Sequence, residues 1–171
     1  MAVSKPIAWR LSWQAPWRAW CARNKPLYCA AILNSMKSRP PTSQEIDALL
    51  ASLPLFSADG FEPVARWAGG ETSDGAMTMP WPQYNPAVEA FMRAAGQEAW
   101  RDEGYDPQKA ARMLQDADLV GRASWDEIKT MLTFCVRGER FSDGHWAAMI
   151  EQGHLRRLLE RLRQLHGEET P

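Results

Sequence analysis

The stretch SWDEIKTMLTFCVRGERFSDGHWAAMIEQGHLRRLLERLRQL, residues 124–165, carries the signals of consecutive short helices. Ser124 followed by Glu127 is the S-x-x-E pattern of a capping box, so a helix is expected to begin here. Apolar residues at helical spacing predict a second helix over 144–152 and a third over 154–165. This region therefore predicts a core built from helices that follow one another closely along the chain.

The ends of these helices are predicted by glycines and polar side chains. We expect Gly138 to end the first helix in a left-handed conformation, with Arg137 beside that helix's negative end. Ser142 or Asp143 is the expected cap of the second helix, and Gly153 is its expected end. The inward-facing positions are then Ile128, Leu132 and Cys135; Trp146, Met149 and Ile150; and Leu155, Leu158, Leu159, Leu162 and Leu165.

Similar helix signals recur upstream, interrupted by one segment of different character. Helices are expected over 42–53, which Thr42 or Ser43 caps and Pro54 ends, and over 85–100 and 106–116, which Asn85 and Asp106 cap. In residues 77–81, Met and Trp alternate with Thr and Pro, which predicts an edge strand paired with 64–68. We therefore predict a mainly α (α+β) fold, a compact bundle of about five to six short helices with one small β-hairpin.

The charge distribution divides the chain of 171 residues into a basic tail and an acidic body. Residues 1–41 carry seven basic side chains and no acidic one, and the rest carries 13 basic and 21 acidic side chains, a balance of 13 - 21 = -8. We expect a basic, tryptophan-rich tail over 1–41, one globular helical domain over 42–166, and a disordered C-terminus over 167–171. The tail's tryptophans are Trp9, Trp13, Trp17 and Trp20.

Two interpretations of the tail stay open. Met36 is a second candidate start just before a strong helix signal, so residues 1–35 are interpreted as a non-native extension or as a disordered or loosely helical segment. Alternatively, basic residues interleaved with tryptophans are typical of segments that attach to an anionic membrane or to single-stranded nucleic acid. Because the body is acidic, contact with nucleic acid or membrane is expected only through residues 1–41.

Hydropathy and cysteine usage predict the cellular compartment. No apolar run reaches the length of about 20 residues that spans a bilayer. The three cysteines, Cys21, Cys29 and Cys135, lack metal-ligand spacing, and an odd number favours reduced thiols. We therefore expect a cytoplasmic protein, in which Cys135 is a buried apolar side chain rather than a reactive thiol.

One polar cluster is the first candidate site. Arg137, Glu139, Arg140 and His145 lie close together in the sequence near an expected helix start. The two arginines there would bind the phosphate or carboxylate group of a ligand, or a protein partner. His145 or Glu139 would then serve as an acid or base. In the alternative interpretation, the arginines pair with acidic residues of the body and fix the angle between helices.

Two aromatic residues form a second candidate surface. Trp81 and Tyr84 lie close to Pro80 and Pro82. Exposed aromatics beside prolines anchor protein partners, but residues of this kind also cover the core beneath a hairpin. The sequence leaves both interpretations open.

Metal and cofactor motifs are incomplete. Glu151 and His154 form one E-x-x-H pair, whereas carboxylate-bridged di-iron sites need two such pairs, and Gly153 is expected to break the helix between them. Phosphate-loop, dinucleotide and nucleophile-elbow fingerprints are absent from the sequence. We predict neither a structural metal nor a cofactor, and the sequence identifies no catalytic residue.

The order GGETSDGAMTMPWPQYNPAVEAF (69–91), then RGERFSDGHWAAMIEQGHLRRLLERL (137–162), resembles small bacterial proteins grouped as domain of unknown function 6508. The resemblance extends over roughly residues 42–165 and omits the tail. It implies no established activity, cofactor or catalytic residue. The matching positions are Tyr84, Val88, Phe91, Arg137, Arg140, Phe141, Gly144, Gly153 and Leu162.

Our leading hypothesis is a non-enzymatic protein-binding or accessory domain with an unknown protein partner. The first alternative is a small enzyme or anion-binding regulator that uses Arg137, Glu139, Arg140 and His145. The second is attachment to a membrane or nucleic acid through the tail. A homodimer through the leucine face of 155–165 also stays open, because a sequence does not distinguish an internal face from an interface.

Overall fold

The computed structural model describes residues 39–71 and 75–169. The chain divides into two units, Met1–Lys37 and Ser38–Pro171, and all described residues belong to the second. The predictions for the tryptophan-rich tail and its two cysteines therefore lie outside the described residues, apart from the last three positions of the tail.

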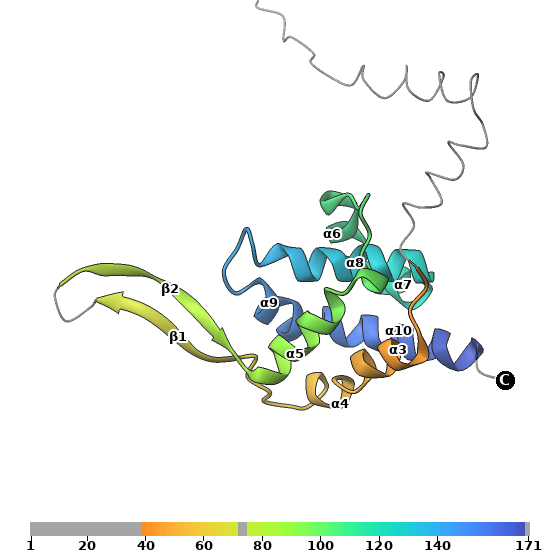
Figure 1. Cartoon of the computed structure of the whole chain (residues 1–171), viewed down its shortest axis with the longest axis horizontal. Helices are drawn as coiled ribbons and strands as arrows, with labels where there is room; N and C mark the ends of the chain where they lie inside the picture. The colour runs from red at the N-terminus through yellow and green to blue at the C-terminus, as the bar shows by residue number, and fades with distance from the viewer. Residues whose placement is uncertain (1–38, 72–74, 170–171) are drawn as a thin grey trace, which may run out of the picture. The chain divides into compact units, whose positions relative to one another are not determined.

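The described region is mainly α-helical, with one antiparallel two-stranded hairpin, as predicted (Figure 1). In chain order the elements are α3 (Ser43–Leu50), α4 (Leu53–Phe56), β1 (Val64–Glu71), β2 (Met77–Tyr84), α5 (Pro86–Ala95), the 3-10 helix η1 (Glu98–Trp100), α6 (Pro107–Gln115), α7 (Ala117–Gly121), α8 (Trp125–Gly138), α9 (His145–Glu151) and α10 (His154–Glu169).

Four helices begin at the capping residues that the sequence predicts. Thr42 and Ser124 start α3 and α8, each in a capping box with the glutamate three residues later. Asn85 and Asp106 start α5 and α6 and accept hydrogen bonds from backbone N–H groups of the first turn. These starts were predictable because the donor and acceptor lie within three residues of each other.

Two short helices and one early helix end differ from the prediction. Pro54, expected to end a helix, lies in the first turn of α4, where its missing N–H is not needed. Asp116 caps α7 by accepting a hydrogen bond from the Leu119 N–H at 3.0 Å. The helix predicted over 85–100 ends at Ala95, and η1 then turns Trp100 into the core.

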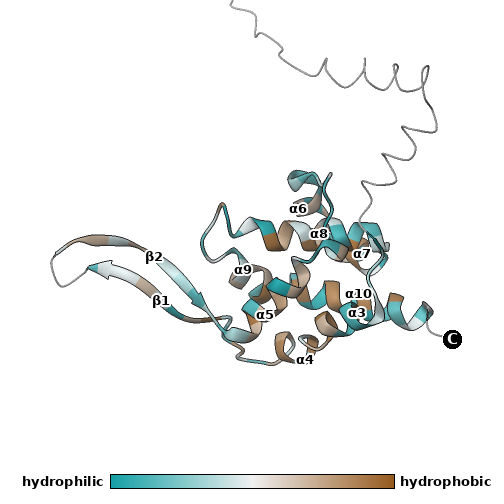
Figure 2. Ribbon diagram, viewed as in Figure 1, coloured by the Kyte–Doolittle hydropathy of each residue, from teal (hydrophilic) through white to brown (hydrophobic). Residues whose placement is uncertain are grey.

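Helix α10 lies along the core and packs against α3, α7 and α9. Its leucines at 155, 158, 159, 162 and 165 are all buried, so the chain's own helices cover the leucine face. Apolar positions gather between the helices in Figure 2. The helix continues to Glu169, four residues past the predicted end and into the segment expected to be disordered.

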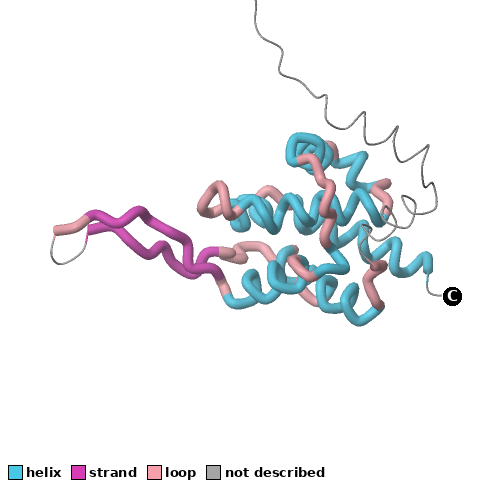
Figure 3. Tube along the Cα trace, turned by 45° about the horizontal axis from the view of Figure 1, so that its top comes forward, coloured by secondary structure: helices cyan, strands magenta, loops and turns pink. Residues whose placement is uncertain are grey.

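The hairpin extends away from the helices, and the views in Figures 1 and 3 agree on this. Its register pairs Val64 with Tyr84 at the root and Glu71 with Met77 near the turn. Gly69 has a φ of 97°, and a Cβ there would lie 2.6 Å from the backbone oxygen of Met79. A glycine is therefore required at this position, where the register between the two strands shifts between Ala68 and Gly70.

Candidate functional site

The hairpin exposes an unusual amount of apolar side chain. Met77, Met79 and Trp81 of β2 are 76%, 83% and 47% exposed, and the register shift opposite Gly69 interrupts the regular alternation of faces between Met79 and Trp81. We call these three residues the apolar stripe. Trp67 of β1 is 56% exposed. Large apolar side chains gathered on an arm outside the core are typical of a surface that another protein covers.

The root of the hairpin is fastened to the helices through Tyr84. This residue is 9% exposed, its ring lies 5.0 Å from the Trp146 ring, and its hydroxyl donates a 2.5 Å hydrogen bond to Glu139. Burial, the hydrogen bond and the charge of Glu139 raise the Tyr84 pKa above its usual range. Tyr84 thus belongs to the packed root, whereas Trp81 belongs to the exposed arm.

Glu139 caps α9, which corrects our prediction that Ser142 or Asp143 does so. Its carboxylate accepts hydrogen bonds from the backbone N–H groups of Gly144, at 3.0 Å, and Trp146, at 2.9 Å. Gly144 is the N-cap residue, in a left-handed conformation without a side-chain cap. With the Tyr84 hydroxyl, three donors surround this one carboxylate, so it joins β2, α8 and α9.

His145 lies over Gly138, at the end of α8. Its ring is 5.2 Å from the Phe134 ring, and a Cβ on Gly138 would lie 2.2 Å from the His145 Nε2. Burial lowers the pKa of His145, against the opposing effect of Glu139. Gly138 has no positive φ and is the last residue of α8, so our prediction of a left-handed stop there is wrong. The close approach of the imidazole ring explains this glycine instead.

Arg137 and Arg140 line one cavity together with a third arginine, Arg101. The cavity measures about 260 Å³, and we call it the arginine pocket. Its remaining lining residues are Ala95, Gly96, Thr133 and Val136. The structure therefore divides the predicted cluster, since neither Glu139 nor His145 lines this pocket. Sequence reasoning missed Arg101 because it lies far upstream of the other two arginines.

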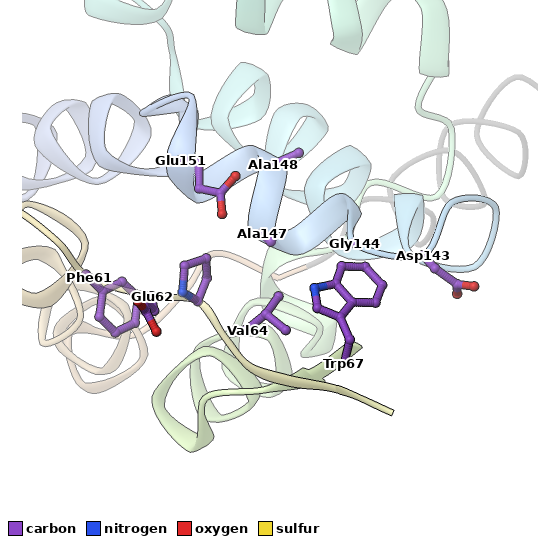
Figure 4. A pocket seen from close by; sticks show the side chains of 10 residues that line it. Phe61, Glu62, Val64, Trp67, Asp143, Gly144, Ala147, Ala148 and Glu151 are labelled. Atoms are coloured by element: carbon purple, nitrogen blue, oxygen red, sulfur yellow. The ribbon is translucent and has the colours of Figure 1, made fainter. Parts of the chain in front are cut away.

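A larger cavity of about 450 Å³ lies between the hairpin root and α9, and we call it the hairpin groove (Figure 4). Its ten lining residues are Phe61, Glu62, Pro63, Val64, Trp67, Asp143, Gly144, Ala147, Ala148 and Glu151. The lining holds three carboxylates and no Lys, Arg or His. The sequence contains no local pattern that predicts this groove, because two segments far apart in the chain, 61–67 and 143–151, form it.

Figure 4 shows which side chains border the hairpin groove. The Trp67 indole lies beside Gly144, where a Cβ would come within 3.3 Å of the ring. Glu151 points from α9 toward the segment that carries Glu62, and Asp143 lies at the other end. The groove thus combines an aromatic wall with negative charge, a combination that suits a cationic side chain.

Metal-ligating residues do not gather in the described part of the chain. Residues 39–71 and 75–169 contain no group of three His, Cys, Asp or Glu side chains placed to hold a metal ion. In the E-x-x-H pair, Gly153 separates α9 from α10 with a φ of 70°. The His154 ring is instead held by Gln152 and Arg157, at 3.1 Å and 2.8 Å.

Cys135 is fully buried, and burial raises its pKa to about 12. In a Cys21→Ser/Cys29→Ser variant, we expect Cys135 to resist an aromatic disulfide reagent at about pH 8 until the protein unfolds, because the thiolate is the reacting form. Absorbance time courses in buffer and in denaturant measure this. A Glu71→Cys substitution in the same background is the control and should react at once. Rapid reaction of Cys135 in buffer would contradict its burial.

No helix among the described residues is both long and apolar enough to cross a membrane. Neither the curated proteins nor the solved structures contain a match to this chain. A family model described as "Family of unknown function (DUF6508)" matches residues 41–168. This match covers most of the chain and nearly all of the described domain, so the protein belongs to the DUF6508 family.

Proposed function

We propose that this domain is a non-enzymatic protein-binding module whose hairpin is the docking arm. The observation that carries the proposal is the apolar stripe, which is exposed although the helical core nearby is well packed. Exposed aromatic and methionine side chains supply most of the energy in many protein interfaces, and methionine adapts to the shape of a partner.

The two strands of the hairpin differ in how well their free edges can pair with an added strand of a partner. Pro80 and Pro82 lie in β2 and carry no backbone N–H, so this strand has few donors for an added strand. Strand β1 contains no proline and has its outer edge free of any strand in the described sheet. A partner that adds a strand would therefore pair with β1.

The hairpin groove adds a preference for charge. Its carboxylates, from Glu62, Asp143 and Glu151, face no basic residue within the lining of the cavity. A partner with a Lys or Arg side chain next to its apolar surface fits both the groove and the arm. We therefore propose a basic, partly apolar segment of a protein as the partner.

Light-activated cross-linking in the native cell tests this function. A photoreactive phenylalanine analogue at Met79, on the arm, is expected to give a discrete adduct with one protein, whereas the same analogue at Arg163, on the exposed face of α10, gives none. The partner is then identified, purified and titrated with the full chain. Equal adducts from both positions would refute a docking role of the arm.

The titration also has a matched pair of variants. Trp81→Ala should weaken binding by roughly tenfold or more, because interface tryptophans are frequent hot spots. Phe141→Ser removes a side chain that is 85% exposed but lies outside the hairpin, and should leave the affinity unchanged. Both positions are at the surface, so unfolding measurements should show little change. Equal affinities of the parent and Trp81→Ala would contradict the proposal.

A further inference from the structure

We infer that the arginine pocket binds a small oxyanion, the phosphate or carboxylate group of a ligand that remains to be identified. Guanidinium groups from two segments border this cavity of about 260 Å³: Arg101 precedes α6, and Arg137 and Arg140 lie at the end of α8. A planar guanidinium matches two oxygens of a phosphate or carboxylate, and several converging on one space are typical of anion recognition. This inference does not rest on the proposed docking function.

The segment that carries Arg101 is held in place on α8. The backbone N–H of Asp102 donates to the Thr133 hydroxyl at 2.9 Å, and the Thr130 hydroxyl donates to the Asp102 carboxylate at 2.7 Å. Arg101 itself donates to the carbonyl oxygen of Gly96 at 3.4 Å. These bonds fix one side of the pocket before any ligand arrives, which lowers the entropy lost on binding.

Arg137 is oriented by an aromatic ring. Its guanidinium carbon lies 5.3 Å from the centre of the Tyr105 ring, and its side chain is 32% exposed. Stacking on an aromatic face leaves the N–H groups at the edge of the guanidinium free to donate to an oxyanion. Arg101 and Arg137 each have a neighbour besides Glu103 that orients them, the Gly96 carbonyl oxygen and the Tyr105 ring respectively.

The positive charge of the pocket is only partly balanced. The Glu103 carboxylate oxygens lie 3.4 Å from a guanidinium nitrogen of Arg101 and 3.8 Å from one of Arg137. The Glu103 side chain is 59% exposed. Arg140 forms no side-chain hydrogen bond or ion pair within residues 39–71 and 75–169. An exposed carboxylate between two guanidiniums marks where an oxyanion fits, and an arriving anion would displace it and also contact Arg140.

Substitutions of the pocket arginines and of Glu103 should change the affinity for an anion in opposite directions. The full chain is titrated with inorganic phosphate and, separately, with succinate, and binding is followed by calorimetry and by NMR shifts. Saturable binding is expected. Arg137→Ala and Arg140→Ala should each weaken it roughly tenfold, the loss of one charge-assisted contact. Glu103→Gln should tighten it, because the competing carboxylate is removed.

Two control variants separate the pocket from general electrostatics. Arg163→Ala on α10 and Glu71→Gln near the hairpin turn change the net charge in the same way but lie on other elements, and should leave binding unchanged. If phosphate binds and succinate does not, the ligand carries a phosphate; the reverse result indicates a carboxylate. The inference is overturned if neither anion binds saturably, or if Arg137→Ala and Arg140→Ala behave like Arg163→Ala.

Arg140 keeps the test valid if the other variants unfold. Its side chain is exposed and has no partner within the described residues, so Arg140→Ala should preserve the unfolding midpoint. Loss of anion binding in a folded Arg140→Ala protein can come only from the pocket. Retained binding in that variant counts against the site.

Discussion

Replacing Glu139 with alanine is expected to lower the free energy of unfolding by about 3 kcal/mol. The substitution removes the cap of α9, a loss of about 1 kcal/mol, and leaves the Tyr84 hydroxyl buried without its acceptor, a loss of about 1–3 kcal/mol. Chemical denaturation monitored by circular dichroism measures the difference. A loss of this size would show that Glu139 holds the hairpin root and α9 together.

The control variants for this prediction separate its parts. Tyr84→Phe removes only the hydroxyl and should cost about 1 kcal/mol. Arg140→Ala, one position further along the chain, should change stability by less than about 0.5 kcal/mol because the side chain is exposed. If Glu139→Ala unfolded like the parent, the three hydrogen bonds to this carboxylate would not be what holds the hairpin root and α9 together.

Gly138→Ala is expected to destabilise the domain by about 1–3 kcal/mol, although alanine is normally the better helix residue. The new Cβ would lie 2.2 Å from Nε2 of His145 and would force the ring away from Phe134. Gly121→Ala is the matched control: this helical glycine has open space around its Cβ position, so alanine should be neutral or slightly stabilising there.

A double-mutant cycle identifies the cause of the Gly138 effect. Because the clash is with one ring, His145→Ala combined with Gly138→Ala should be more stable than the sum of the two single effects, by about 1 kcal/mol or more. Unfolding free energies of the four proteins give the coupling. Additive effects, or a Gly138→Ala protein as stable as Gly121→Ala, would contradict the packing account.

Much of the fold was predictable because its signals are local. The capping residues Thr42, Asn85, Asp106 and Ser124 identified helix starts, and the alternation at 77–81 identified a strand. The short helices α4 and α7 were missed because about one turn gives too little periodicity to recognise.

The candidate site was predictable only in part. Arg137 and Arg140 lie three positions apart at a helix end, so their proximity followed from the sequence. Arg101 joins them only because Thr130 and Thr133 bind the segment that follows it, a contact between distant parts of the chain. The sequence indicated Glu139 as a candidate acid or base, and its role as the cap of α9 became visible only once Tyr84 and the start of α9 were placed around it.

By itself, the sequence determined where α3, α5, α6 and α8 begin, most of the positions that face the core, and that one hairpin interrupts the helices. Hydrogen bonds within a turn and the spacing of apolar residues are properties of neighbouring residues, and they need no knowledge of the rest of the chain. Only the tertiary structure decided that Trp81 is exposed while Tyr84 is packed, and that Glu139 and His145 do not line the arginine pocket. Burial and cavities depend on which distant segments pack together, because water is excluded only by side chains that meet in space.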